Sequence, residues 1–304
     1  MLQLIRESWT SASTNTKLLL VFLSVAILSS LAVITIVVRN WRADAPIVEE
    51  DLSQHKSRDL LRVIRQTDIG EGPVQLLGIA EKAVLDRHLN VIGGIKNISS
   101  ISSIRFSGQV TFQGGLVQEV IVVKKGGDRM RTSVRSKKTQ TSWVISPESN
   151  WRGIWVNGNL REVQDLGDDE LENSLRYINV VSELYLAQQN EWDLRYLGVK
   201  DFNYRMAHVF EVKMGPRHIV EFYIDPNSFL DMGQVEKVFE SDGTLNITRR
   251  IHRKHFQANG FTLPSRVDTY VNGELIQRFD LESAIFNAGV LDSVFERPEL
   301  DVTP

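Results

Sequence analysis

Histidines are the residues of this chain that come closest to a catalytic or metal-binding pattern. His252 and His255 form an H-x-x-H pair in RRIHRKHF. On a helix the two rings would share a face, but the flanking pattern predicts a strand, where an odd spacing places them on opposite faces. No Glu stands beside them as in the zinc-binding H-E-x-x-H pattern. His208 and His218 flank a predicted hairpin, yet two His without a third ligand make an incomplete zinc site.

Other catalytic patterns do not occur in the sequence. There is no G-x-S-x-G, P-loop or G-x-G-x-x-G. Cysteine is absent, which excludes disulfides, Cys-ligated zinc, iron–sulfur clusters, thiol nucleophiles and the lipidated Cys of a bacterial lipoprotein. We therefore predict that the protein is not an enzyme, with no catalytic residues, no metal and no cofactor.

Composition narrows the class of partner. The 304 residues are 42% hydrophobic and 24% charged, as in a folded globular protein. The 35 Lys and Arg nearly balance 38 Asp and Glu, giving a net charge of −3. Because nucleic-acid-binding proteins usually carry excess positive charge, we expect no nucleic acid partner.

An uncharged apolar run, LLLVFLSVAILSSLAVITIVV, occupies residues 18–38 and is long enough to cross a bilayer as a helix. Lys17 and Arg39 bracket it. The alternative is a cleavable signal peptide, since residues 43–45 read Ala-Asp-Ala. The run exceeds the roughly 7–15 apolar residues of a signal peptide, and Pro46 follows the candidate cleavage site. We therefore predict an uncleaved anchor.

The anchor divides the chain into four parts. We expect a cytoplasmic tail at 1–17, a transmembrane helix at 18–38, a linker with a short amphipathic helix at 39–75, and a folded domain at 76–304. Basic residues lie on both sides of the span, so the positive-inside rule gives little guidance. The short tail and the large following domain favour a single-pass protein of the bacterial inner membrane with its C-terminal domain in the periplasm.

Within the domain, the hydrophobic period changes along the chain. Apolar residues at helical spacing predict a helix near 79–92, which Gly93 and Gly94 end. From Ser103 the period becomes two, and short strands follow one another through Gly-rich and Asn-Gly turns. One helix, predicted over 167–189, interrupts them. Roughly ten to twelve antiparallel strands should curl strongly or close into a barrel.

Three stretches resemble the bacterial outer-membrane lipoprotein-sorting family, the LolA/LolB-like proteins, over about residues 79–299. These are AVLDRHLNVIGGIKNISSISSIRFSGQVTF, RHIVEFYIDPNSFL and the run from His255 to Glu299. The positions that carry the last match are Gly260, Leu263-Pro264, Asn287 and Phe295-Glu296-Arg297-Pro298. The chain departs from the family's soluble carrier and lipidated receptor in its predicted transmembrane anchor.

The resemblance implies an α+β fold, mainly antiparallel β: a strongly curved half-open β-barrel with helices on its concave face. It also implies that the concave face binds acyl chains of lipid or lipoprotein. The strands with the cleanest alternation would then supply the ligand-binding residues, which are Phe106, Val110, Phe112, Val220, Phe222 and Ile224.

Three functions remain open from the sequence. The first is a membrane-anchored lipid- or lipoprotein-binding protein of the cell envelope, in lipoprotein sorting or lipid handling. The second is an envelope stress sensor that uses the same lipid-binding fold and a protein partner. The third is a hydrolase, for which activity lost on His252→Ala or His208→Ala would be the evidence.

The predicted topology can be checked by proteolysis. Protease added to spheroplasts should digest the domain that follows residue 43, because only the run at 18–38 is apolar enough to span the membrane. Protection of that domain, or a mature chain beginning at Pro46, would contradict the prediction.

Overall fold

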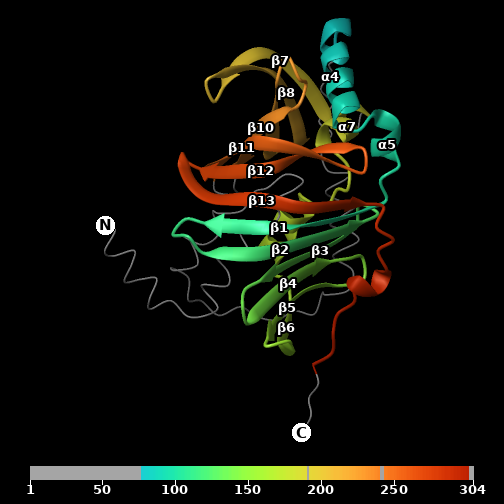
Figure 1. Ribbon diagram of the computed structural model, residues 1–304, viewed down its shortest axis with the longest axis vertical. Coiled ribbons are helices and arrows are strands. Elements are labelled where there is room, and N and C mark those ends of the chain that lie inside the picture. The colour runs from blue at the N-terminus through green and yellow to red at the C-terminus, as the bar shows by residue number, and fades with distance from the viewer. Residues whose placement is uncertain (1–76, 190–191, 240–242, 301–304) are drawn as a thin grey trace.

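The computed structural model describes residues 77–189, 192–239 and 243–300, coloured in Figure 1. The predicted tail, transmembrane helix and linker helix lie outside the described residues. None of the helices in the described ranges is both long and apolar enough to cross a membrane.

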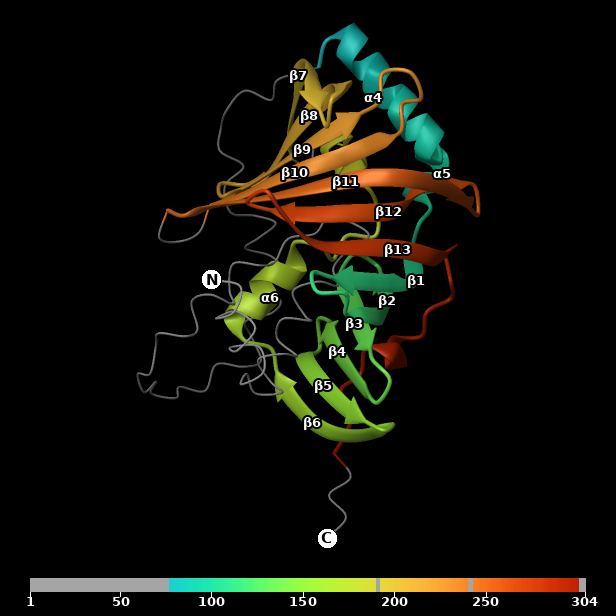
Figure 2. The same cartoon turned by 60° about the vertical axis from the view of Figure 1, so that its left-hand side comes forward.

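The described chain forms one antiparallel sheet of thirteen strands in the order β6-β5-β4-β3-β2-β1-β13-β12-β11-β10-β9-β8-β7. Two meanders are thus joined where β1 pairs with β13, and the sheet curls without closing into a barrel (Figures 1 and 2). The predicted antiparallel class is confirmed. The strands are β1 Ser103–Phe112, β2 Val117–Lys125, β3 Arg129–Arg135, β4 Thr139–Ile145, β5 Asn150–Val156, β6 Asn159–Asp165, β7 Asp193–Phe202, β8 Arg205–Gly215, β9 His218–Ile224, β10 Asp231–Phe239, β11 Leu245–Ala258, β12 Phe261–Val271 and β13 Glu274–Phe286.

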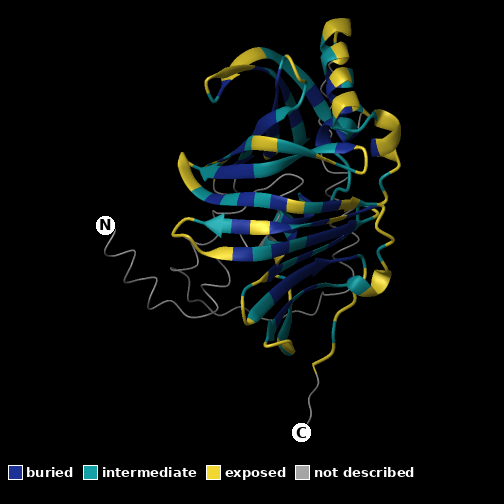
Figure 3. Ribbon diagram, in the orientation of Figure 1, coloured by how far each residue is buried: buried dark blue, intermediate teal, exposed yellow. Residues whose placement is uncertain are grey.

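The hairpin turns follow from local chemistry. Asn157-Gly158, Asn259-Gly260 and Asn272-Gly273 all have positive φ at both residues, which Asn and Gly tolerate best. Between turns, burial alternates along the strands. β1, for example, buries Phe106 and Val110 and exposes Arg105 and Gln109. Figure 3 shows the buried and exposed segments along this strand.

The helices are α4 Ile79–Ile92, α5 Ile95–Ser99, α6 Asp168–Leu175, α7 Glu183–Gln188 and the 3₁₀ turn η1 Asp292–Val294. α4 ends at Gly93, whose φ is 153° and where a Cβ would lie 2.4 Å from the ring of Phe261. Glycine therefore lets the helix end approach β12. Figure 2 shows α6 on the inner side of the curved sheet.

The single helix predicted over 167–189 is wrong, because residues 176–182 separate α6 from α7. This connecting segment contains Ile178, Val180 and Val181, whose β-branched side chains favour helix less than their neighbours do. It also gives up helical hydrogen bonds: the carbonyls of Tyr177 and Asn179 accept from the buried ammonium of Lys124.

Two apolar cores lie on the concave face. The first joins β1–β4 to β13 and includes Phe106, Val110 and Phe279. The second packs α4, α5 and α7 on β7–β9 and includes Leu85, Leu184 and Phe222. On the opposite face, the C-terminal segment covers β4 and β5 with Phe295, and Trp151 donates to its carbonyl. The two concave-face cores meet at the middle of the sheet.

A substitution at Gly108 tests the close packing where β1 of one meander pairs with β13 of the other. Gly108 lies at the bulge where β1 pairs with β13, and a Cβ there would come within 2.2 Å of the Asp280 carbonyl oxygen. Gly108→Ala should lower the free energy of unfolding by about 1–3 kcal/mol, because backbone must move to admit the methyl group. Gly215→Ala is the control, since nothing lies within 4 Å of that Cβ position. Urea unfolding followed by circular dichroism measures both, and equal losses would contradict the assignment.

Candidate functional site

A mainly apolar cavity of about 130 Å³ lies where the two concave-face cores meet. Strands from both meanders line it, together with α5 and the connecting segment 176–182. The apolar lining residues are Ile92, Ile98, Ile101, Ile104, Phe106, Val180, Val181, Phe222, Phe261, Leu263, Pro264, Val267 and Phe286.

Aromatic rings build one wall of this apolar cavity. The ring centroid of Phe286, at the end of β13, lies 4.0 Å from that of Phe261 and 6.0 Å from that of Phe106. Register explains the grouping, because β1 and β13 pair Ile104 with Phe286 and Phe106 with Ala284 on the same face.

The structure brings together only part of the predicted binding set. Phe106 and Phe222 both line the apolar cavity although they belong to different cores. Val110 packs within the first core and Phe112 beside it, while Val220 and Ile224 pack within the second. That all six residues contact a ligand stays a prediction.

The residues that close the apolar cavity at one end were not predicted from the sequence as binding residues. Ile98, Ile101 and Ile104 recur at every third position from α5 into β1, and this spacing is the signal that could have identified them. Asn287 fixes this end, because its Oδ1 accepts from the backbone N–H of Ser102 at 2.7 Å. The Asn noted in the family resemblance thus holds Ile101 and Phe286 on the same side of the cavity.

Buried charges form the polar end of the cavity, where Arg250 belongs to both the lining and a wider network. Glu236 is fully buried and contacts Arg250 Nη2 at 2.5 Å and His218 Nε2 at 2.6 Å. Tyr177 donates to the same carboxylate at 2.9 Å. Burial opposes ionisation of Glu236, yet Arg250 and His218 hold its pKa below the usual range. Tyr177 thereby ties the connecting segment to β10.

A second buried pair holds the same segment from the other meander. Lys124 on β2 is 2% exposed, and besides the Tyr177 carbonyl it donates to that of Asn179 at 3.0 Å. Burial lowers the pKa of Lys124 to about 7 against the attraction of Glu183, and burial raises the pKa of Glu183 to about 7. Glu183 also lines the cavity. The connecting segment is therefore fastened to both halves of the sheet.

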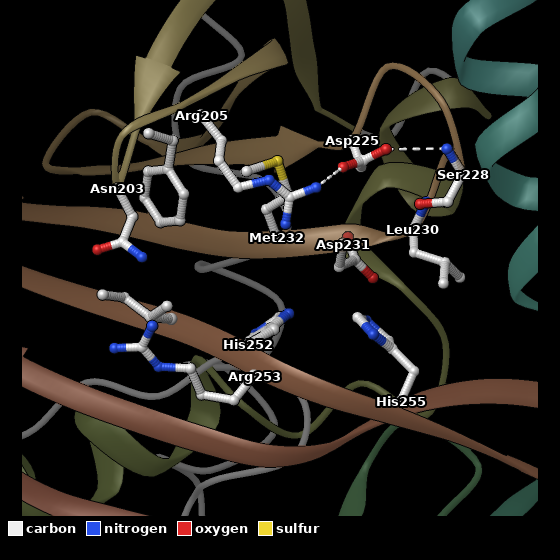
Figure 4. Close-up of a pocket in the computed structure, with 12 residues that line it drawn as sticks. Asn203, Arg205, Asp225, Ser228, Leu230, Asp231, Met232, His252, Arg253 and His255 are labelled. Atoms are coloured by element: carbon white, nitrogen blue, oxygen red, sulfur yellow. Dashed lines mark hydrogen bonds and ion pairs between the residues drawn. The ribbon is translucent and has the colours of Figure 1, made fainter.

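A polar cavity of about 270 Å³ lies next to the apolar one, at the rim where β9 turns into β10 (Figure 4). Both cavities include Asp231 and His252 in their linings. Arg205 pairs with Asp225 at this rim. The full lining is Phe202, Asn203, Arg205, Asp225, Ser228, Leu230, Asp231, Met232, Ile251, His252, Arg253 and His255.

The expectation that His252 and His255 lie on opposite faces is wrong. Register shifts between His252 and Lys254 and between Lys254 and His255 interrupt the alternation of β11. Both imidazoles consequently line the polar cavity and point toward Asp231 (Figure 4).

His208 and His218, the other two histidines considered as metal ligands, lie apart, toward opposite ends of the β8–β9 hairpin. His208 pairs with Ile224 in register and its Nδ1 lies 2.7 Å from the Tyr196 hydroxyl, whereas His218 contacts Glu236. Across the described ranges, no three His, Asp or Glu side chains gather in a way that could hold a metal ion.

Comparison with known proteins finds similarity only at the level of structure. No family model and no curated protein matches the chain. Similar solved structures include a DUF1329 family protein from Desulfovibrio piger (10% identity, 71% of this chain and 96% of that one, TM-score 0.45). Others are a putative outer membrane lipoprotein-sorting protein domain from Vibrio parahaemolyticus (10%, 71% and 97%, 0.44) and a LolA superfamily protein from Nitrosomonas europaea (11%, 71% and 97%, 0.45).

The last two descriptions agree with the family that the sequence motifs resemble.

We expect Glu236→Gln to lower the free energy of unfolding strongly, because Glu236 lies in the buried charge network. Neutralising the carboxylate leaves Arg250 buried without its counter-charge, so the free energy of unfolding should fall by about 3–5 kcal/mol. Glu119→Gln removes the exposed partner of Arg135 and should cost about 1 kcal/mol or less. Urea unfolding compares the two variants, and similar losses would show that the network contributes little to stability.

Proposed function

We propose that this chain is a membrane-anchored periplasmic protein that binds the acyl chain of a lipid or lipoprotein in the apolar cavity. The observation that carries the proposal is the cavity between the two cores, with Phe106 and Phe222 contributed by separate meanders. Each methylene moved from water against the apolar part of this lining contributes about 0.8 kcal/mol.

The size of the cavity indicates how much of a chain it admits. An apolar cavity of about 150 Å³ holds a molecule as small as benzene. At about 130 Å³, the cavity as described takes only a short part of an acyl chain. A longer chain requires one wall to move.

The connecting segment 176–182 is the wall best suited to move. Val180 and Val181 line the cavity only partly buried, and the segment lies between α6 and α7 and belongs to neither helix. It is held by hydrogen bonds that involve Lys124 and Glu236 and by the packing of Ile178, Val180 and Val181. If the segment is displaced, its polar groups form hydrogen bonds with water instead. The acyl chain then takes the place of Val180 and Val181 against the sheet.

We infer binding rather than catalysis at this site. Glu236 is engaged with Arg250 and His218, and Lys124 is engaged with carbonyl groups of the connecting segment. The inner-membrane location, with residues 18–38 as the anchor, is part of the same proposal and rests on the apolar run.

Photo-crosslinking tests the acyl-chain site. The full chain, kept soluble in amphipol, is irradiated with a fatty acid that carries a diazirine in mid-chain, and cross-linked peptides are mapped by mass spectrometry. Saturable labelling should occur at micromolar ligand in the peptides that contain Phe106, Phe222 and Phe261. Absence of saturable labelling there would overturn the proposal.

Two variants sharpen this test. Phe222→Glu buries a charge in the cavity wall and should reduce labelling by about tenfold or more. Phe239→Glu changes the same residue type at an exposed position of the sheet and should leave labelling unchanged. If Phe222→Glu does not fold, Ile101→Trp fills the cavity without adding a charge and should reduce labelling similarly.

A further inference from the structure

The polar cavity has no part in holding an acyl chain, yet it adjoins the apolar cavity. Asp231 and His252 belong to both linings, so the two cavities share these two residues as a common wall. A molecule that filled both would have an apolar chain at one end and a polar group at the other.

Two buried nitrogen atoms in this region lack hydrogen-bond partners. Among the described residues, nothing bonds Nδ1 of His252 or Nε2 of His255. Against burial, which lowers the pKa of both imidazoles, the backbone of Asp231 raises it, as a carbonyl that accepts from a ring N–H does. Buried polar atoms are rarely left without a partner, and in such positions they commonly face a ligand or an ordered water.

The protonation state defines what these nitrogens require. Burial lowers the pKa of His252 to about 4 and also lowers the pKa of His255, so both rings are neutral at pH 7. A neutral imidazole that donates through one nitrogen accepts through the other. The two free positions therefore call for hydrogen-bond donors.

The charges around the cavity argue against a strongly anionic ligand. Arg205 and Asp225 form an ion pair, and Asp231 adds a second carboxylate beside the imidazoles. Arg253 also lines the cavity, but it pairs with Asp268. The lining thus carries two arginines and two carboxylates, a balance that suits a neutral or zwitterionic group.

We propose that the polar cavity is the head-group subsite for the lipid whose chain enters the apolar cavity. It takes a neutral or zwitterionic head that donates hydrogen bonds to His252 and His255, as a primary ammonium or a hydroxyl does. This inference rests on the proposed acyl-chain site and names the class of lipid that the site selects.

Matched pairs of lipids test the inference on the wild-type full chain in amphipol. Each unlabelled lipid competes with the diazirine fatty acid for cross-linking in the apolar cavity. Lysophosphatidylethanolamine and lysophosphatidylcholine of equal chain length differ only in whether the ammonium can donate. Monoacylglycerol and the fatty acid methyl ester make the corresponding hydroxyl pair. In each pair, the lipid that carries a hydrogen-bond donor should compete at a concentration that is lower by about fivefold or more.

A variant assigns the preference to the polar cavity. His255→Leu removes one of the two acceptors, and His255 lines the polar cavity but not the apolar one, so the variant should reduce the difference within each pair while acyl-chain labelling persists. His208→Leu is the matched control, because His208 lines neither cavity and contacts Tyr196. The wild-type comparison stands even if His255→Leu does not fold.

The outcomes separate this inference from the proposed function. A preference in the ammonium pair alone assigns a primary ammonium, and a preference in the hydroxyl pair alone assigns a hydroxyl; both support the subsite. Equal competition within both pairs, or a preference that is undiminished in folded His255→Leu, overturns the subsite but leaves acyl-chain binding intact. Failure of the fatty acid to label the wild type overturns the proposed function itself.

Discussion

The carboxylate of Glu236 is the interaction on which the concave face depends. It accepts from Tyr177 and contacts Arg250 and His218, so it joins β9, β10 and β11 to the segment between α6 and α7. Without this anion, the buried guanidinium of Arg250 would lose the carboxylate that it contacts, which is costly. This carboxylate therefore helps to set the position of the connecting segment, which forms part of the wall of the apolar cavity.

Lys124 and Glu183 complete the arrangement in a different way. A buried Lys–Glu pair has no net charge whether the proton stays on the ammonium or moves to the carboxylate. With both pKa values brought to about 7 by burial, neither arrangement strands a lone ion in the core. The sheet can therefore hold a polar segment across its apolar face, and water or ligand can replace that segment without leaving an isolated charge behind.

The sequence was sufficient for the parts of the fold that follow a regular period. Alternation along β1 and β9 correctly assigned the inward residues, and Asn-Gly pairs marked the hairpins. The pairing of β1 with β13 could not be read from any local pattern, so neither could the meeting of Phe106 with Phe222 at one cavity.

In two places the structure departs from the regular hydrophobic period, and the predictions made from that period were wrong there. Two register shifts in β11 rotate His255 into the cavity with His252, and periodicity cannot reveal a bulge. The break between α6 and α7 depends on carbonyl groups that accept from Lys124, which lies far away in the sequence. The polar half of the candidate site arises from exactly these long-range and irregular features, while the apolar half was partly predictable.

The pairing of β1 with β13 also sets the order in which the molecule can fold. β1–β6 and β7–β12 connect neighbours along the chain and can assemble as local meanders, but β1 must wait for the last strand to be made. Until then its edge offers unpaired backbone groups beside Phe106 and Val110, a template for pairing with other chains. Such non-local closure slows folding, since loop entropy is lost before the contacts form. The newly made chain therefore passes through a state that is prone to aggregation. This state ends when residues 274–286 pair with the open edge of β1.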